Sequence, residues 1–164
     1  MAALGVLILL VGLIQIVLLS VGVPLGFLDG RLYYPAEEIH RVLVQQGEAG
    51  RLLYGQLETI DLLFILVYTW LLVELTRRLR LKAKWRVPAY LAFLPIGVAT
   101  ASDAVETVGI LSLLSRFPEQ APELERLISW ATPIKWLGLF FAILQVAFLL
   151  AQRLIKPKEA TQSF

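Results

Sequence analysis

Two acidic residues, Asp103 and Glu106, lie within the apolar segment "ATASDAVETVGIL" at residues 99–111. Side chains three residues apart share one face of a helix. Two neighbouring carboxylates can act as a general acid and a general base, bind a cation, or pair with a basic side chain. If the segment crosses a membrane, each charge costs about 2.5–3.5 kcal/mol at the helix centre, and each is therefore a candidate site residue.

The composition indicates an integral membrane protein of one domain, residues 1–164. Of the 164 residues, 58% are hydrophobic and only 17% are charged, whereas soluble domains carry roughly 25% charged residues. The mean hydropathy is +0.74. A soluble domain of this length could not bury so much apolar surface. The chain has no cysteine, which excludes disulfides, thiol redox chemistry and thiolate metal ligands.

Four apolar segments are long enough to cross about 30 Å of hydrocarbon, which needs ~20 helical residues. We expect helices, because a spanning chain must satisfy its own backbone hydrogen bonds and these segments are too long for barrel strands. The first segment lacks the basic start and the short apolar run of a signal peptide, so we expect it to remain as a span. The spans are predicted at about residues 4–23, 57–75, 87–114 and 127–150.

The connection of residues 24–56 is too long for a bare loop in a small bundle. Its segment "YYPAEEIHRVLVQQG" has Pro35 where a helix would begin, two glutamates in the first turn, and Gly47 where the helix would end. We therefore expect an amphipathic helix at about 35–46. The predicted fold is all-α, an integral membrane four-helix bundle with this additional amphipathic helix in the outer connection between the first two spans.

Basic residues set the expected orientation. The loop "RRLRLKAKWR" at residues 77–86 has six basic residues and no acid, and the tail at 153–164 carries three more. The positive-inside rule places both in the cytoplasm. Both termini are then cytoplasmic, and the connections 24–56 and 115–126 face outward. We expect the plasma membrane, the inner membrane of a bacterium, as the location.

With this orientation, a rise of about 1.5 Å per residue places the charges inside the spans in the outer half of the bilayer. We expect a central polar pocket, open to the outside, in which Lys135 faces the carboxylates. Several acids meet one lysine, so some acids are protonated or another cation is present. The candidate ligand-binding residues are Glu58, Asp61, Tyr68, Asp103, Glu106 and Lys135, and the candidate catalytic residues are Asp103 and Glu106.

Each of these charges also has a structural interpretation. Lys135 with Asp103 or Glu106 could be an interhelical ion pair that fixes the packing of the third and fourth spans. The charges could instead pair with a span of a second copy in a homo-oligomer. Small residues on the third span would let a neighbouring helix approach closely; they are Gly97, Ala99, Ala101, Ser102 and Ala104.

Motifs of known enzyme classes are absent. No nucleophile has a matched histidine and acid, and no H-E-x-x-H motif occurs. His40 is the only histidine, so neither a metal nor another cofactor is expected. A basic loop beside a membrane contacts anionic lipid headgroups more readily than nucleic acid. The expected partners are membrane lipids together with a small amphiphile or a protein.

Three segments, "LETIDLLFILVYTWLL", "ASDAVETVGIL" and "ATPIKWLGLF", resemble a set of small bacterial four-span membrane proteins of unassigned function. The resemblance covers about residues 35–150 and implies fold and location only. The chain departs from the pattern at Thr107, where asparagine is usual. A looser likeness is to the EXPERA domain of sterol isomerases, also a four-span bundle with membrane-embedded acids and a ligand pocket. The EXPERA motif does not match this chain residue by residue. The landmarks of the bacterial set, D-L-x-F-x-x-x-Y, D-x-x-E-N and K-W, fall on Asp61, Phe64, Tyr68, Asp103, Glu106, Lys135 and Trp136, apart from the asparagine.

Three functions remain open. The first is a non-enzymatic membrane protein whose polar pocket binds a small amphiphile, lipid, cation or partner protein. The second is an EXPERA-like isomerase or lipid-modifying enzyme that uses Asp103 and Glu106 as acid and base. The third is a subunit of a proton-linked transporter. An apolar cavity beneath the acids favours a lipid-like ligand, an aqueous path favours transport, and tight packing with each acid paired favours a structural role.

Overall fold

The computed structural model describes residue 28 and residues 31–81 and 88–154. The predicted first span, residues 82–86 of the basic loop and the end of the tail lie outside the described residues. Within them the chain is all-helical, without strands, as predicted. The helices are α2 (Ala36–Gln45), α3 (Gly47–Leu81), α4 (Ala89–Arg116) and α5 (Pro122–Leu154).

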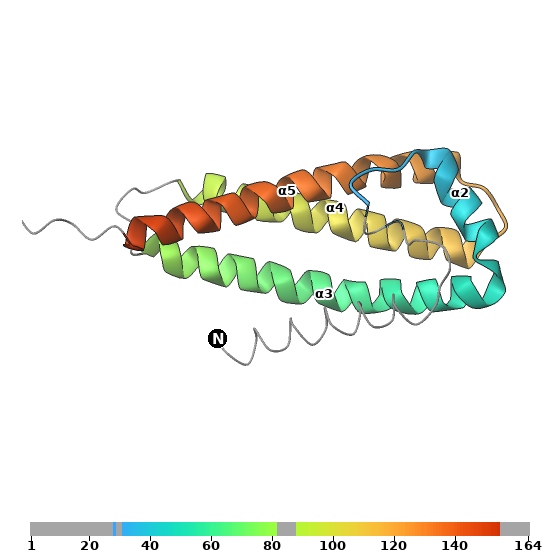
Figure 1. The fold of residues 1–164 in the computed structure, drawn as a ribbon, viewed down its shortest axis with the longest axis horizontal. Coiled ribbons are helices and arrows are strands. Elements are labelled where there is room, and N and C mark those ends of the chain that lie inside the picture. The colour runs from blue at the N-terminus through green and yellow to red at the C-terminus, as the bar shows by residue number, and fades with distance from the viewer. Residues whose placement is uncertain (1–27, 29–30, 82–87, 155–164) are drawn as a thin grey trace, which may run out of the picture.

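Three described helices, α3, α4 and α5, are long and apolar enough to cross a membrane. They run side by side, and α2 lies across the end where α3 begins (Figure 1). These helices confirm the second, third and fourth segments as membrane-span candidates. Two of them are longer than predicted, because α3 already begins at Gly47 and α5 at Pro122. The additional turns include polar residues such as Glu48 and Glu123, since helical hydrogen bonds do not require apolar side chains.

Helix α2 forms in the connection of residues 24–56, where a helix was predicted at about 35–46. It ends just before Gly47, as predicted. Gly47 has a φ of +66°, a conformation that costs glycine nothing because it has no Cβ. This residue reverses the chain between α2 and α3. One face of α2 is buried against the ends of the long helices, together with Tyr34 and Tyr54. The buried residues of α2 are Ile39, Val42 and Leu43.

Helices α4 and α5 approach each other most closely at two glycines. A Cβ placed on Gly138 would lie 2.7 Å from the backbone nitrogen of Ala99, and one on Gly109 would lie 2.6 Å from the side chain of Ile128. Small residues at such crossings permit dense van der Waals packing between membrane helices. The face of α4 that carries Ala99 is therefore closed by α5.

The close crossing predicts a large effect at Gly138. We expect Gly138→Leu to lower the free energy of unfolding by roughly 1–3 kcal/mol, because the new side chain meets backbone that cannot move aside. The measurement is thermal unfolding of the purified protein in detergent, followed by circular dichroism. The matched control is Gly97→Leu, since a Cβ on Gly97 meets nothing within 4 Å. Equal melting temperatures for the two variants would contradict the crossing.

Candidate functional site

The side chain of Lys135 lies between two carboxylates. Its Nζ is 3.1 Å from Oδ1 of Asp103 and 2.5 Å from Oε2 of Glu106. Less than a tenth of each of the three side chains is exposed. We call Asp103, Glu106 and Lys135 the ion cluster. The structure thus brings together three residues that the sequence placed on two different spans.

Local helix geometry explains how the cluster forms. Asp103 and Glu106 are one turn apart on α4, so both carboxylates emerge from the same face. Lys135 comes from the facing turn of α5, beyond the buried Thr132. The close approach at Gly138, less than one turn further along α5, keeps the two helices near enough for Lys135 to reach both acids.

Hydroxyl groups complete the coordination of both acids. Oε1 of Glu106 accepts hydrogen bonds from Tyr34 and Thr132, each at 2.7 Å. Oδ2 of Asp103 accepts one from Tyr68 at 2.8 Å. All four carboxylate oxygens of the cluster therefore lie within 3.1 Å of a donor. Oε2 of Glu106 is engaged by the ion pair with Lys135 and not by a hydrogen bond.

The hydrogen bonds extend the cluster to the segment that precedes α2. Ser129 donates to the carbonyl oxygen of Tyr34 at 2.6 Å, and Trp136 donates from Nε1 to the carbonyl oxygen of Arg31 at 2.8 Å. Tyr68 joins the cluster from α3. The ion cluster thus connects α3, α4, α5 and the chain before α2.

Sequence reasoning missed Tyr34, Thr132 and Ser129. Thr132 could have been found, because it lies three residues before Lys135 and shares its helix face. Tyr34 carried no signal, since it lies 72 residues from Glu106 in the chain and is separated from it by two helices. Tyrosine is also common in membrane proteins, so the residue type alone does not identify Tyr34 as part of a site.

The two other predicted acids lie on α3. Oδ2 of Asp61 accepts a hydrogen bond of 3.0 Å from Thr107. The hydroxyl of Thr107, from α4, is thus a donor to a carboxylate of α3. Glu58, one turn earlier on α3, is buried. The ligand-binding roles of Glu58, Asp61, Tyr68 and the cluster residues stay predictions.

The electrostatics of the cluster follow from its composition. Two carboxylates share one ammonium, so the cluster carries one excess negative charge when all three groups are ionised. Such a charge is expensive in a low-dielectric interior unless it is hydrogen-bonded. The hydroxyls of Tyr34, Tyr68 and Thr132 direct their dipoles at these carboxylates. They stabilise the negative charge that Lys135 does not balance.

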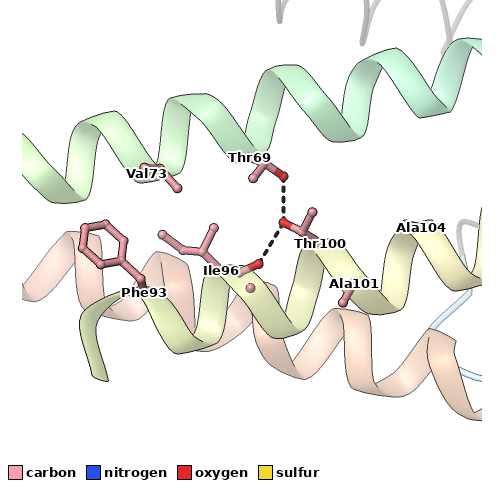
Figure 2. A pocket seen from close by; sticks show the side chains of 8 residues that line it. Thr69, Val73, Phe93, Ile96, Thr100, Ala101 and Ala104 are labelled. Atoms are coloured by element: carbon pink, nitrogen blue, oxygen red, sulfur yellow. Dashed lines mark hydrogen bonds between the residues drawn. The ribbon is translucent and has the colours of Figure 1, made fainter. Parts of the chain in front are cut away.

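A groove of about 480 Å³ lies between α3 and α4, next to the ion cluster along the bundle (Figure 2). Thr69 and Thr100 share a hydrogen bond of 2.7 Å in its wall. Thr100 uses its only proton on the carbonyl oxygen of Ile96, so Thr69 is the donor of the shared bond. None of the predicted site residues lines the groove. Its lining residues are Thr69, Val73, Phe93, Ile96, Gly97, Thr100, Ala101 and Ala104.

Among the described residues, no three histidine, aspartate or glutamate side chains gather in a way that could hold a metal ion. The basic member of the ion cluster instead occupies the space between its two acids.

The ion cluster predicts an unusual pattern of stability. We expect Lys135→Met to cost about 3–5 kcal/mol, because it leaves two buried carboxylates without their ammonium. The triple variant Lys135→Met, Asp103→Asn, Glu106→Gln removes all three charges and is expected to recover most of the loss. Folded yield and melting temperature in detergent, measured by size-exclusion chromatography and thermal unfolding, test this. A triple variant as unstable as Lys135→Met would show that charge balance does not hold the helices.

Comparison of the chain with protein-family models, with curated proteins and with solved structures found no match.

Proposed function

We propose that this protein is a membrane-embedded amphiphile-binding protein that holds an apolar chain in the groove between α3 and α4. The observation that carries this proposal is the groove itself. Its walls are apolar apart from the Thr69–Thr100 pair, and its volume of about 480 Å³ falls in the range of about 300–1,000 Å³ typical of ligand sites. Both helices that form it are apolar enough to cross a membrane.

The ion cluster supports this function as a structural centre. Its carboxylate oxygens are all engaged by protein donors, so a substrate would have to displace those donors before either acid could act on it. This favours the interhelical ion pair over an acid–base enzyme. In the proposed role, the cluster fixes α4 against α5 and ties α3 to α4 through Tyr68, which sets the width of the groove.

A proton path is less well supported. The series of contacts runs from Tyr34 through Glu106, Lys135 and Asp103 to Tyr68. Further along the described helices, residues 69–73, 91–102 and 136–152 contain no acidic or basic side chain. A proton relay needs ionisable groups or ordered water along its whole length. This argues against the transporter alternative.

For the membrane, we propose the bacterial plasma membrane, with four spans and both termini in the cytoplasm. The end of the bundle with the arginines of α3 then faces the cytoplasm, and the end with α2 faces outward. The support is the excess of basic residues at 77–86 and in the tail.

The orientation can be tested with single cysteines, because the chain has none. We expect Glu119→Cys, exposed between α4 and α5, to react with a membrane-impermeant maleimide in intact spheroplasts. Arg78→Cys, exposed at the other end, should react only after the membrane is permeabilised. Mass shifts of the purified protein report the labelling. The reverse pattern would overturn the proposed orientation.

The groove predicts a specific loss of binding. Gly97 lines the groove and has free space around it, so we expect Gly97→Phe to fold and to fill the groove. In this variant the acyl chain of the ligand would lose about ten atom contacts with the groove, each contributing about 0.1–0.2 kcal/mol. The ligand should therefore bind roughly ten-fold more weakly. The measurement is photo-cross-linking with a diazirine-bearing C16 fatty acid, with labelled peptides mapped by mass spectrometry.

The matched control is Val98→Phe, which adds a large side chain at the next, exposed position, outside the groove lining. We expect wild type and Val98→Phe to be labelled in the peptides that line the groove, and Gly97→Phe to lose that labelling. Equal labelling in all three proteins would refute the groove as a binding site.

A further inference from the structure

The groove leads to a cationic group at one end. Phe93 lines the groove, and the guanidinium carbon of Arg80 lies 5.8 Å from the centroid of its ring, within cation–π range. On α3, Thr69, Val73 and Arg80 are spaced by four and seven residues, so they follow one face of the helix. The apolar wall of α3 therefore continues into a positive charge.

Two further arginines lie within one helical turn of Arg80 on α3. Both Arg77, at 2.8 and 3.0 Å, and Arg78 donate to the carboxylate of Glu74. From Glu74 to Arg80 the chain carries three arginines and one glutamate, which gives this segment a net charge of +2. More than half of the side chains of Arg77 and Arg78 is exposed. A guanidinium has five N–H donors, so Arg77 keeps donors for a second anion while bound to Glu74.

The length of the groove matches one lipid leaflet. From Phe93 to Ala104 the groove follows eleven residues of α4, which is about 16 Å at a rise of ~1.5 Å per residue. Half of a ~30 Å hydrocarbon core is about 15 Å. An acyl chain whose headgroup sits at the arginines would therefore reach the far end of the groove at the middle of the bilayer, beside Asp103.

We infer that the groove and the adjoining arginines form a binding site for an anionic glycerophospholipid of the leaflet at the arginine end. The phosphate lies against Arg77 and Arg80, and one acyl chain lies along Phe93, Gly97 and Thr100. This inference rests on the proposed function and names its ligand class. Guanidinium groups bind phosphate through paired hydrogen bonds, and the surplus positive charge favours a lipid with net negative charge over one with an additional ammonium group.

The experiment compares two lipids with identical acyl chains, palmitoyl-oleoyl phosphatidylglycerol and palmitoyl-oleoyl phosphatidylcholine. Each is titrated into the full-length protein in a neutral detergent, and the lipid-bound fraction is measured by native mass spectrometry. We expect wild type to prefer phosphatidylglycerol. In the double variant Arg77→Gln, Arg80→Gln we expect about a ten-fold weaker affinity for that lipid, close to the affinity for phosphatidylcholine.

The control variant Arg116→Gln, Arg126→Gln removes the same charge from the opposite end of the bundle. Arg126 is matched to Arg77, because both are exposed and both pair with a glutamate three residues earlier. We expect the control to keep the preference of wild type. In Glu74→Gln, which removes the competing carboxylate, the affinity for phosphatidylglycerol should increase.

The outcomes separate this inference from the proposed function. Equal affinity for the two lipids in wild type, or an unchanged preference in Arg77→Gln, Arg80→Gln, would overturn the anionic-lipid site. If Gly97→Phe still weakens both lipids in that case, the groove remains a chain-binding site without headgroup selectivity. If Gly97→Phe weakens neither lipid, the proposed function itself is wrong. Melting temperatures of all variants report whether each has folded.

Discussion

Two carboxylates and one ammonium, Asp103, Glu106 and Lys135, lie where less than a tenth of each side chain is exposed. Removing such charges from water is costly, and only close pairing and complete hydrogen bonding compensate for it. That requirement constrains much of the bundle. It demands that α4 and α5 approach closely, that Tyr68 on α3 points toward α4, and that Tyr34 returns across the end of the bundle to reach Glu106.

Helix α4 meets its two neighbours in different ways. Against α5 it is tightly packed, because Gly138 leaves no space beside the backbone of Ala99. Against α3 it leaves a groove, since Gly97 and Ala101 project too little to fill the space to α3. The same class of small residue therefore permits close packing on one face and opens a groove on another. The difference lies in the partner helix: α5 supplies Gly138, whereas α3 supplies Thr69, whose hydroxyl shares a hydrogen bond with Thr100 of α4.

The groove and the ion cluster divide the bundle along its length. The cluster lies toward α2, because Tyr34, just before α2, donates to Glu106. The groove follows α4 in the other direction, from Ala104 to Phe93 (Figure 2), and Arg80 lies beside Phe93. This arrangement suits an amphiphile whose chain stops at the rigid polar layer. Arg80 beside Phe93 marks the opposite end. A ligand bound in this way is enclosed by polar groups at its two ends and by apolar walls between them.

The sequence by itself determined the helical class and three helices able to span a membrane, because apolar runs near 20 residues have few structural solutions in lipid. It also singled out Asp103, Glu106 and Lys135, since charges are rare in such runs. Only the tertiary structure decided what those charges contact. The hydrogen bonds from Tyr34 and Thr132 depend on how the segment before α2 and helix α5 pack against α4. The groove depends on which faces of α3 and α4 are left apart. Helical periodicity describes one helix at a time, whereas these features arise from the spacing between helices.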